Sequence, residues 1–246
     1  MKLFETFLVA MSTYSSLPMP QLEWNEKNML YAICFFPAVG VVCSGALLLW
    51  NWFCCRLNVN PVLFAAAAVC LPLFITGGIH MDGYMDTVDA LASHQSRERK
   101  LEILKDSHTG AFSVISVAFL LLGYYAFMSQ ALSMGVDFFS LCLIPVVSRC
   151  CSSLAVWQLK SMTTSQYAKS RTPRWCIVTV WLLLLGLLMA GLLLFGRSGA
   201  ALAVAAAGYS MALCRAYRLL DGMNGDISGF CICISELCAA AALILL

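Results

Sequence analysis

The sequence predicts an all-α fold, a polytopic integral membrane bundle of about seven transmembrane helices with an acidic active site at its cytoplasmic face. Composition gives the first reason, because 61% of the 246 residues are hydrophobic and only 11% are charged, where a soluble domain carries roughly 25% charged residues. The second reason is that apolar runs of spanning length recur along the whole chain. With a net charge of +2, nothing indicates binding to nucleic acid. We treat residues 1–246 as one integral membrane domain.

The predicted helices follow in chain order. The N-terminal MKLFETFLVAM is expected to form a short amphipathic helix in the membrane interface rather than a cleaved signal, because Glu5 interrupts the apolar stretch. A spanning helix needs roughly 20 mostly apolar residues, and the good candidates are residues 30–52, 111–134, 138–159, 175–195 and 229–246. Two weaker candidates are short and rich in alanine, and so are expected inside the bundle: residues 61–78 and 199–214.

The distribution of charge gives the orientation. With a cytoplasmic N-terminus and alternating spans, the lysines and arginines outside the spans gather on the cytoplasmic side, and only Arg56 and Arg197 lie opposite. The acidic residues divide in the same way. Asp137 faces outward, and the cytoplasmic face receives Asp82, Asp86, Asp89, Glu98, Glu102, Asp106, Asp221 and Asp226. The prediction is a multi-pass protein of the cell (inner) membrane with cytoplasmic active-site loops.

The strongest chemical signal is the stretch GGIHMDGYMDTVDA, residues 77–90. Its aspartates Asp82, Asp86 and Asp89 are spaced i, i+4, i+7 and therefore share one stripe of a helix. Like charges on one stripe repel one another, and hard carboxylate oxygens favour Mg²⁺ or Mn²⁺ over zinc. We predict a metal site on these side chains, against the alternative of a solvated polar face. His80 is taken as a hydrogen-bonding neighbour rather than a metal ligand.

A second polar segment, KDSHTG, directly precedes an apolar span. Lys105 and Ser107 suit phosphate oxygens, and Asp106 beside them is a candidate metal ligand or base. A helix cap explains the hydroxyl groups almost as well.

The third segment, LLDGMNGDISG, leads into the last span. Asn224, Gly225 and Asp226 lie where glycines expose backbone N–H groups at a helix N-terminus, and such a terminus favours bound anions. A simple turn is the alternative.

Two charged residues fall inside predicted spans, Arg149 and Glu236. An ionisable group at membrane depth is a functional candidate. Arg149 is suited to a phosphate or a carboxylate, and snorkelling or structural pairing with Glu236 explains it equally well.

These segments together are similar to the motifs of the cobalamin synthase family, the adenosylcobinamide-GDP ribazoletransferases. The similarity is carried by GGIHMDGYMDTVDA, RERKLEILKDSHTGAF and GMNGDISG, with SLPMP, FFPAVG and PVVSR, in collinear order over nearly the whole chain. The chain departs from the family pattern at Ala90, His108, Asn224 and Cys233, where Gly, Arg, Thr and Glu are expected.

The resemblance implies an Mg²⁺-dependent transfer at the cytoplasmic membrane. The ribose hydroxyl of α-ribazole, or of its 5′-phosphate, attacks the corrinoid-side phosphorus of adenosylcobinamide-GDP, GMP leaves, and adenosylcobalamin or its 5′-phosphate forms. The metal ligands would be Asp82, Asp86 and Asp89, and the catalytic residues Asp106 and Asp226. The substrate-binding residues would be His80, Lys105, Ser107, Arg149, Asn224, Gly225 and Glu236. The partners are then these substrates and the lipid bilayer, and a homo-oligomer or association with other corrinoid-pathway enzymes stays open.

Three other classes fit the residues less well. A CDP-alcohol phosphotransferase also uses a metal-binding aspartate helix, but its characteristic aspartate-glycine and Ala-Arg arrangement is missing from the sequence. A membrane prenyltransferase needs two aspartate-rich motifs, and the segment at 219–229 has too few acids. A cation transporter predicts carboxylates near the midplane, whereas here the acids gather at one face.

Overall fold

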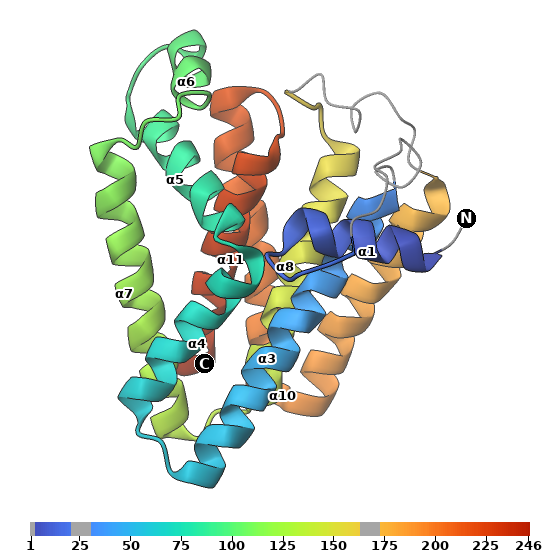
Figure 1. Ribbon diagram of the computed structural model, residues 1–246, viewed down its shortest axis with the longest axis vertical. Helices are drawn as coiled ribbons and strands as arrows, with labels where there is room; N and C mark the ends of the chain where they lie inside the picture. The colour runs from blue at the N-terminus through green and yellow to red at the C-terminus, as the bar shows by residue number, and fades with distance from the viewer. Residues whose placement is uncertain (1–2, 21–30, 163–172) are drawn as a thin grey trace.

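The computed structural model describes residues 3–20, 31–162 and 173–246. Within these ranges the chain is helical, apart from turns, connecting segments and one isolated β-bridge between Ser161 and Met223 (Figure 1). The elements are α1 Leu3–Tyr14, the 3₁₀ turn η1 Ile33–Phe35, α3 Phe36–Leu57, α4 Pro61–Thr76, α5 Ile79–Ala92, α6 Arg97–Ile103, α7 Ala111–Met134, α8 Phe138–Gln158, α10 Arg174–Leu220 and α11 Gly225–Leu245.

Several of these helices can cross a membrane. Five of the described helical segments are long and apolar enough, and six spans result if the bent pair α4 and α5 counts as one. Large apolar side chains also stay on the outside of the bundle, where Phe119 and Leu193 are 72% and 76% exposed, as expected for helices that face lipid. The predicted polytopic helical membrane protein is confirmed, and the count of seven spans stays a prediction.

Helix α10 is not one straight helix. Its 47 residues would extend about 70 Å at 1.5 Å per residue, more than twice the thickness of a bilayer core. The backbone leaves the helical conformation at Gly196, with φ 55° and ψ −121°. Beyond this break Gly199 lies directly against the backbone of Gly191, so the chain reverses and the two arms run side by side (Figure 1). The predicted spans 175–195 and 199–214 correspond to these arms.

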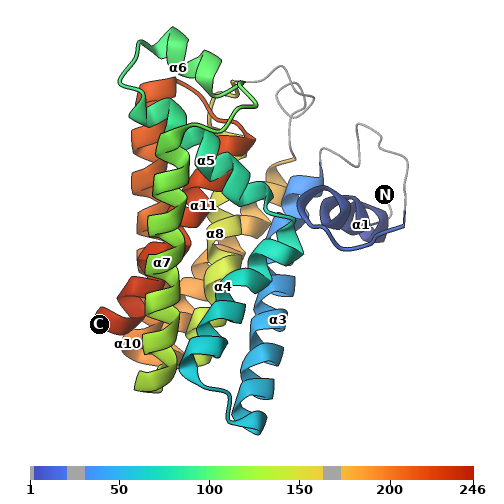
Figure 2. The same cartoon turned by 60° about the vertical axis from the view of Figure 1, so that its left-hand side comes forward.

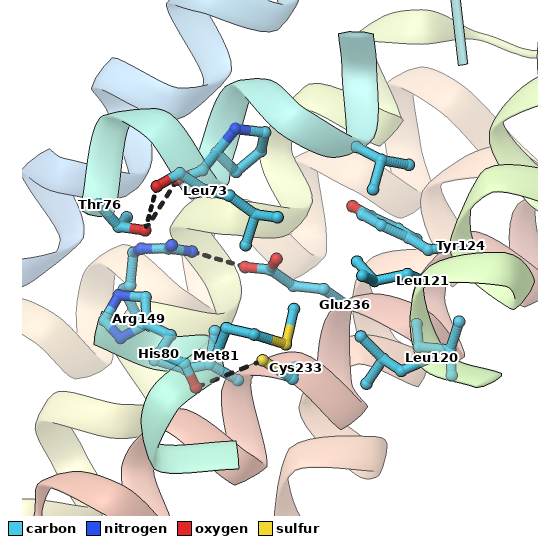
Figure 3. A pocket seen from close by; sticks show the side chains of 14 residues that line it. Leu73, Thr76, His80, Met81, Leu120, Leu121, Tyr124, Arg149, Cys233 and Glu236 are labelled. Carbon is cyan, nitrogen blue, oxygen red and sulfur yellow. Dashed lines mark hydrogen bonds and ion pairs between the residues drawn. The ribbon is translucent and has the colours of Figure 1, made fainter. Parts of the chain in front are cut away.

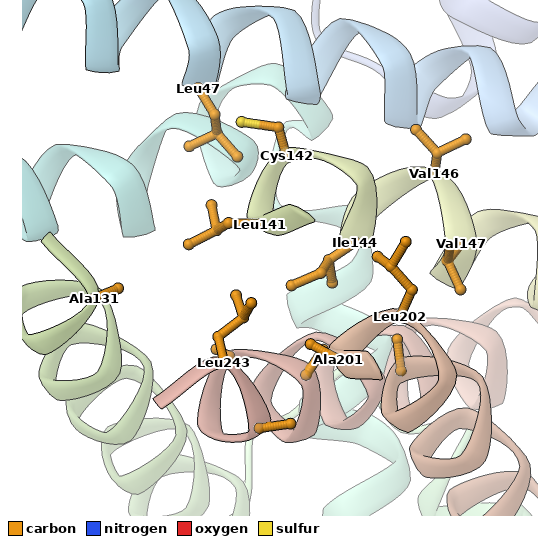
Figure 4. Close-up of a cluster of buried hydrophobic side chains, with 14 of the residues drawn as sticks. Leu47, Ala131, Leu141, Cys142, Ile144, Val146, Val147, Ala201, Leu202 and Leu243 are labelled. Carbon is orange, nitrogen blue, oxygen red and sulfur yellow. The ribbon is translucent and has the colours of Figure 1, made fainter. Parts of the chain in front are cut away.

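Helix α8 is the central helix of the bundle. Its apolar side chains Leu141 and Ile144 meet Leu47, Leu202 and Leu243, which come from α3, α10 and α11 (Figure 4). Buried serines add hydrogen bonds between the helices. The Ser153 hydroxyl donates to the carbonyl oxygen of Ile33 at 2.9 Å, and Ser152 bonds to Ser228 of α11. Such small polar residues are frequent where membrane helices pack closely.

A sharp elbow separates α4 from α5, which are bent by 93° relative to each other. Gly77 and Gly78 form it with φ of 63° and 77°, a region that glycine adopts without strain. The carbonyl groups freed at the end of α4 find partners in the N-terminal segment, because the backbone N–H of Ser16 donates to Ile75 at 2.8 Å and its hydroxyl donates to Phe74.

The elbow directs α5 toward one end of the bundle. There α5 packs against α7 and α11, beside α6 and the junction of α10 with α11 (Figure 2). The α3–α4 and α7–α8 connections lie at the opposite end (Figure 1). The predicted acidic segments are thus gathered at a single end of the molecule.

Candidate active site

The crossing of α5 with α11 brings two of the predicted segments together. A Cβ atom at Gly83 would lie 2.7 Å from the Cα of Asp226, and one at Gly229 would lie 2.6 Å from the carbonyl oxygen of His80. Since real Cβ atoms do not approach backbone so closely, both positions require glycine for this crossing. The aspartate stripe of α5 therefore lies beside the first turn of α11.

Three carboxylates from the two helices share this region. Asp82 is exposed, while Asp86 and Asp226 are partly buried. Asp86 lies within electrostatic range of both Asp82 and Asp226, and Asp226 within range of Asp82. Among the described residues none of the three forms an ion pair with a lysine or arginine. The site thus holds concentrated negative charge that a cation would neutralise. The stripe on α5 was predictable, whereas the addition of Asp226 depends on the helix crossing.

Asp89 has a different environment from its two neighbours on the stripe. Its carboxylate accepts the backbone N–H groups of Gly110 at 2.7 Å and Ser113 at 2.9 Å. These are free N–H groups of the first turn of α7, whose own N-cap residue supplies no side-chain bond. A carboxylate also suits the positive end of the helix dipole. The structure therefore gives Asp89 a capping role that was not predicted from the sequence. The sequence feature that could have suggested it is Gly110 at the start of α7, which has no side chain to cap the helix itself.

The donor chemistry of the remaining acids fits a hard divalent cation, because carboxylate and amide oxygens are ligands that Mg²⁺ accepts. Within the described ranges no three His, Cys, Asp or Glu side chains are already arranged to hold an ion. Binding would require side-chain rotation, which the exposure of Asp82 and partial exposure of Asp86 permit. The metal site stays a prediction.

The start of α11 is a well-formed helix cap. The side-chain oxygen Oδ1 of Asn224 accepts the backbone N–H of Ile227 at 2.9 Å, and its Nδ2 group donates to the carboxylate of Asp226 at 2.7 Å. Gly225 is exposed at the first helical position. Asn224 thus orients Asp226, and the predicted cradling of substrate by Asn224 and Gly225 is not tested by this geometry.

The predicted phosphate-binding segment forms the exposed connection between α6 and α7. Lys105 and Ser107 are both exposed there. Asp106 accepts the backbone N–H of His108 at 3.0 Å, and the imidazole lies 2.6 Å from the same oxygen. The hydrogen bond from His108 holds the pKa of Asp106 below its usual range. A carboxylate with a lowered pKa is a weaker proton acceptor.

Two ion pairs connect the start of α6, the segment after α8 and the end of α10. Asp221 accepts from Arg97 at 2.8 Å and from Lys160 at 3.0 Å. The hydrogen bond from Lys160, with the charge of Arg97, lowers the pKa of Asp221. These contacts between segments far apart in the chain were not predicted from the sequence.

The two intramembrane charges bind each other. Arg149 Nη1 lies 2.6 Å from Glu236 Oε1, and the Ser148 hydroxyl donates to that same oxygen at 2.9 Å. Arg149 is 1% and Glu236 9% exposed. Pairing of Arg149 with Glu236, one of the alternatives that the sequence left open, is therefore present in the structure. Because the guanidinium is already bound by this carboxylate, the geometry does not favour direct contact of Arg149 with phosphate.

His80 lies beside this pair (Figure 3). Its ring packs edge-on against Phe36, with centroids 5.5 Å apart, and its carbonyl oxygen accepts from the Cys233 thiol at 3.6 Å. His80, Arg149 and Glu236 line one cavity. On α5, His80 precedes Asp82 by two residues and Asp86 by six.

Comparison with known proteins places these features in context. A family model described as cobalamin-5-phosphate synthase matches residues 6–244. An adenosylcobinamide-GDP ribazoletransferase of Lachnoclostridium phytofermentans is 35% identical over 100% of this chain and 95% of that protein. Proteins of the same name from Clostridium botulinum and Clostridium perfringens are 29% and 32% identical, each over 96% of this chain and over 95% and 96% of their own lengths. No solved structure matches significantly.

Proposed function

Because the chain belongs to the cobalamin-5-phosphate synthase family, we propose that it transfers ribazole to adenosylcobinamide-GDP. The observation that carries this proposal is the family match over residues 6–244, together with relatives named adenosylcobinamide-GDP ribazoletransferase that align over 95% and 96% of their lengths. The acidic end of the bundle provides a place for the reaction.

The reaction breaks one phosphorus–oxygen bond and forms another. The ribose hydroxyl oxygen of ribazole, or of its 5′-phosphate, attacks the phosphorus on the cobinamide side of the pyrophosphate. The bond to GMP breaks, the hydroxyl proton passes to a base, and GMP leaves. The product is adenosylcobalamin or its 5′-phosphate.

Asp82 and Asp86 would hold a Mg²⁺ ion, with Asp226 facing them from α11. When bound, Mg²⁺ neutralises negative charge on the pyrophosphate oxygens. Asp89 is left out of this proposed ligand set, because each of its oxygens already accepts a backbone N–H. Its role here is to fix α5 to the start of α7.

Asp226 is the better candidate for the base. Asp106 is engaged by His108 and has a lowered pKa, whereas Asp226 lies beside the α5 carboxylates and is oriented by Asn224. Lys105 and Ser107 would bind phosphate oxygens. They lie on the exposed segment that ends at Gly110, whose N–H group is bound by Asp89.

The acidic end is proposed to face the cytoplasm of the cell membrane. Support comes from the basic residues of the connections at this end, which include Arg97, Arg99, Lys105 and Lys160, because short cytoplasmic loops carry an excess of lysine and arginine. This orientation exposes the site to nucleotide substrates.

The direct test is a transfer assay with the purified protein in liposomes. Adenosylcobinamide-GDP and α-ribazole 5′-phosphate are supplied with Mg²⁺ or with chelator, and GMP and the corrinoid product are measured. We expect equal amounts of both products with Mg²⁺ and neither with chelator. If no divalent ion supports product formation, ribazole transfer is rejected; product formed equally well in chelator rejects the metal.

A further inference from the structure

A cavity inside the bundle lies apart from the residues assigned to the transfer. It lies next to the α4–α5 elbow and is enclosed by α4, α5, α7, α8 and α11 (Figure 3). Its walls are mostly apolar and include Leu73, Leu120 and Leu121. The polar part of its lining includes His80, Arg149 and Glu236. An apolar pocket with a few convergent polar groups is the usual form of a small-molecule site.

Two buried polar atoms in this lining lack partners. Within the described part of the chain, Nε2 of His80 and Nε of Arg149 make no hydrogen bond. Buried polar groups in native proteins are normally hydrogen-bonded to protein, water or ligand. The Arg149 Nε–H group can only donate, so a suitable ligand presents an acceptor atom.

The charge of the cavity selects against phosphate. The guanidinium of Arg149 is already compensated by Glu236 at 2.6 Å. An added anion would leave net negative charge at membrane depth, which is strongly unfavourable. The ligand that fits is therefore neutral, largely apolar, and carries a hydrogen-bond acceptor.

We propose that the cavity receives the aromatic base of ribazole. The inference rests on the proposed function, whose substrates also contain anionic phosphates, hydroxyl-rich riboses, a guanine with several polar groups, and the much larger corrin ring. The two-ring base of ribazole is the part that is neutral, mostly apolar, and supplied with a ring-nitrogen acceptor. The structure thus assigns the acidic end to the phosphates and the cavity to the base.

The position of the cavity agrees with this assignment. His80 in its lining precedes Asp82 and Asp86 on the same helix, so it lies within about 9 Å of both along the helix axis at 1.5 Å per residue. This short separation along the helix axis is what the assignment of base and ribose hydroxyl to neighbouring sites requires.

The base must displace side chains to enter. The cavity measures about 40 Å³, which suits two or three water molecules. Met81 and Leu121 line it, and the unbranched thioether of Met81 adapts readily to a new neighbour.

Binding is tested without turnover. Full-length protein in phosphatidylcholine nanodiscs is titrated with 5,6-dimethylbenzimidazole and followed by saturation-transfer NMR, with no adenosylcobinamide-GDP present. Leu121→Trp fills the cavity, and Leu122→Trp is the matched control because Leu122 is 65% exposed on the outer side of α7. We expect saturable binding in wild type and Leu122→Trp, loss in Leu121→Trp, and competition by α-ribazole. Binding that is unsaturable, or equal in both variants, overturns the proposal.

Kinetics separate this proposal from the proposed function. Leu121→Trp is expected to raise KM for α-ribazole roughly tenfold or more while KM for adenosylcobinamide-GDP stays within about twofold. Leu121→Ala, which removes bulk, should fold and accept a ribazole analogue with a larger base. Equal changes in both KM values overturn the base site while ribazole transfer stands. Base binding in a protein that releases no GMP rejects the transfer and leaves the base site intact.

Discussion

The three aspartates of α5 have different environments although they lie within about two helical turns. Asp82 and Asp86 face Asp226 without a basic partner among the described residues, whereas Asp89 caps α7 through two backbone N–H groups. Sequence spacing places all three on one stripe and cannot distinguish them. Their contacts with neighbouring helices do.

Asp89→Asn should therefore affect stability and leave metal affinity nearly unchanged. An asparagine amide presents only one acceptor oxygen, so one N–H at the start of α7 loses its partner. Loss of a helix cap costs about 0.5–2 kcal/mol. We expect a lower Tm in nanodiscs and faster hydrogen exchange at residues 110–113.

Asp82→Asn is the matched comparison for this prediction. Asp82 is exposed and caps nothing in the described structure, so its Tm should be unchanged while its affinity for Mg²⁺ falls. If Asp89→Asn weakens Mg²⁺ binding as much as Asp82→Asn does, Asp89 is a metal ligand after all.

The Arg149–Glu236 pair is a second feature of residue scale. Glu236→Gln would leave the guanidinium of Arg149 buried without its counter-charge, and breaking a buried pair from one side costs about 3–5 kcal/mol. Thermal unfolding in nanodiscs should show a large fall in Tm. The double variant Arg149→Met/Glu236→Leu should recover much of the loss, because an apolar pair of similar size leaves no unpaired charge. A double variant no more stable than Glu236→Gln contradicts this explanation.

At the scale of elements, the α5–α11 crossing determines whether the carboxylates meet. Gly83→Ala places a methyl group against the backbone of Asp226, which cannot move as a flexible side chain would. Overpacking of this kind costs typically about 1–3 kcal/mol, and separating the helices should also reduce transfer activity. Gly186→Ala, where no atom lies within 4 Å of the added Cβ, should keep full activity. Equal activity of the two variants would mean that close contact of α5 and α11 is not required.

The Asp221 cluster links the start of α6, the segment after α8 and the end of α10. Because Lys160 and Arg97 lower its pKa, Asp221 contributes stability that is present above the usual aspartate pKa and is lost as the pH falls through its lowered value. Wild type should therefore have a higher Tm than Asp221→Asn at neutral pH, and the two should converge in acid. A difference that is independent of pH would assign the effect to something other than this charge.

For the molecule as a whole, the sequence was most informative about class and topology. Hydropathy located the apolar spans, and the position of the acids correctly placed the acidic segments at one end of the bundle. The short alanine-rich stretch at 61–78 corresponds to α4, and the glycines at its end form the elbow. These features follow from local composition and from glycine, whose conformational preferences act within a few residues.

Contacts between distant helices could not be predicted in the same way. Asp89 contacts Gly110 and Arg149 contacts Glu236 across large sequence separations. A single sequence does not show which residues of two distant helices lie opposite each other. The pairing of Arg149 with Glu236 was one of several open alternatives. Asp226 lies beside the α5 aspartates because Gly83 and Gly229 allow the backbones of α5 and α11 to touch. The sequence alone does not show that these two glycines meet the opposite helix.

The most direct test of the central claim, that Asp82 and Asp86 of α5 bind a divalent metal beside α11, is Mn²⁺ binding followed by electron paramagnetic resonance. Wild type is compared with Asp86→Asn and with Glu102→Gln, which removes an exposed acid of α6. The predicted result is saturable binding in wild type and Glu102→Gln, displaced by Mg²⁺, and a loss of affinity of roughly tenfold or more in Asp86→Asn. Equal affinity in all three proteins would contradict the claim.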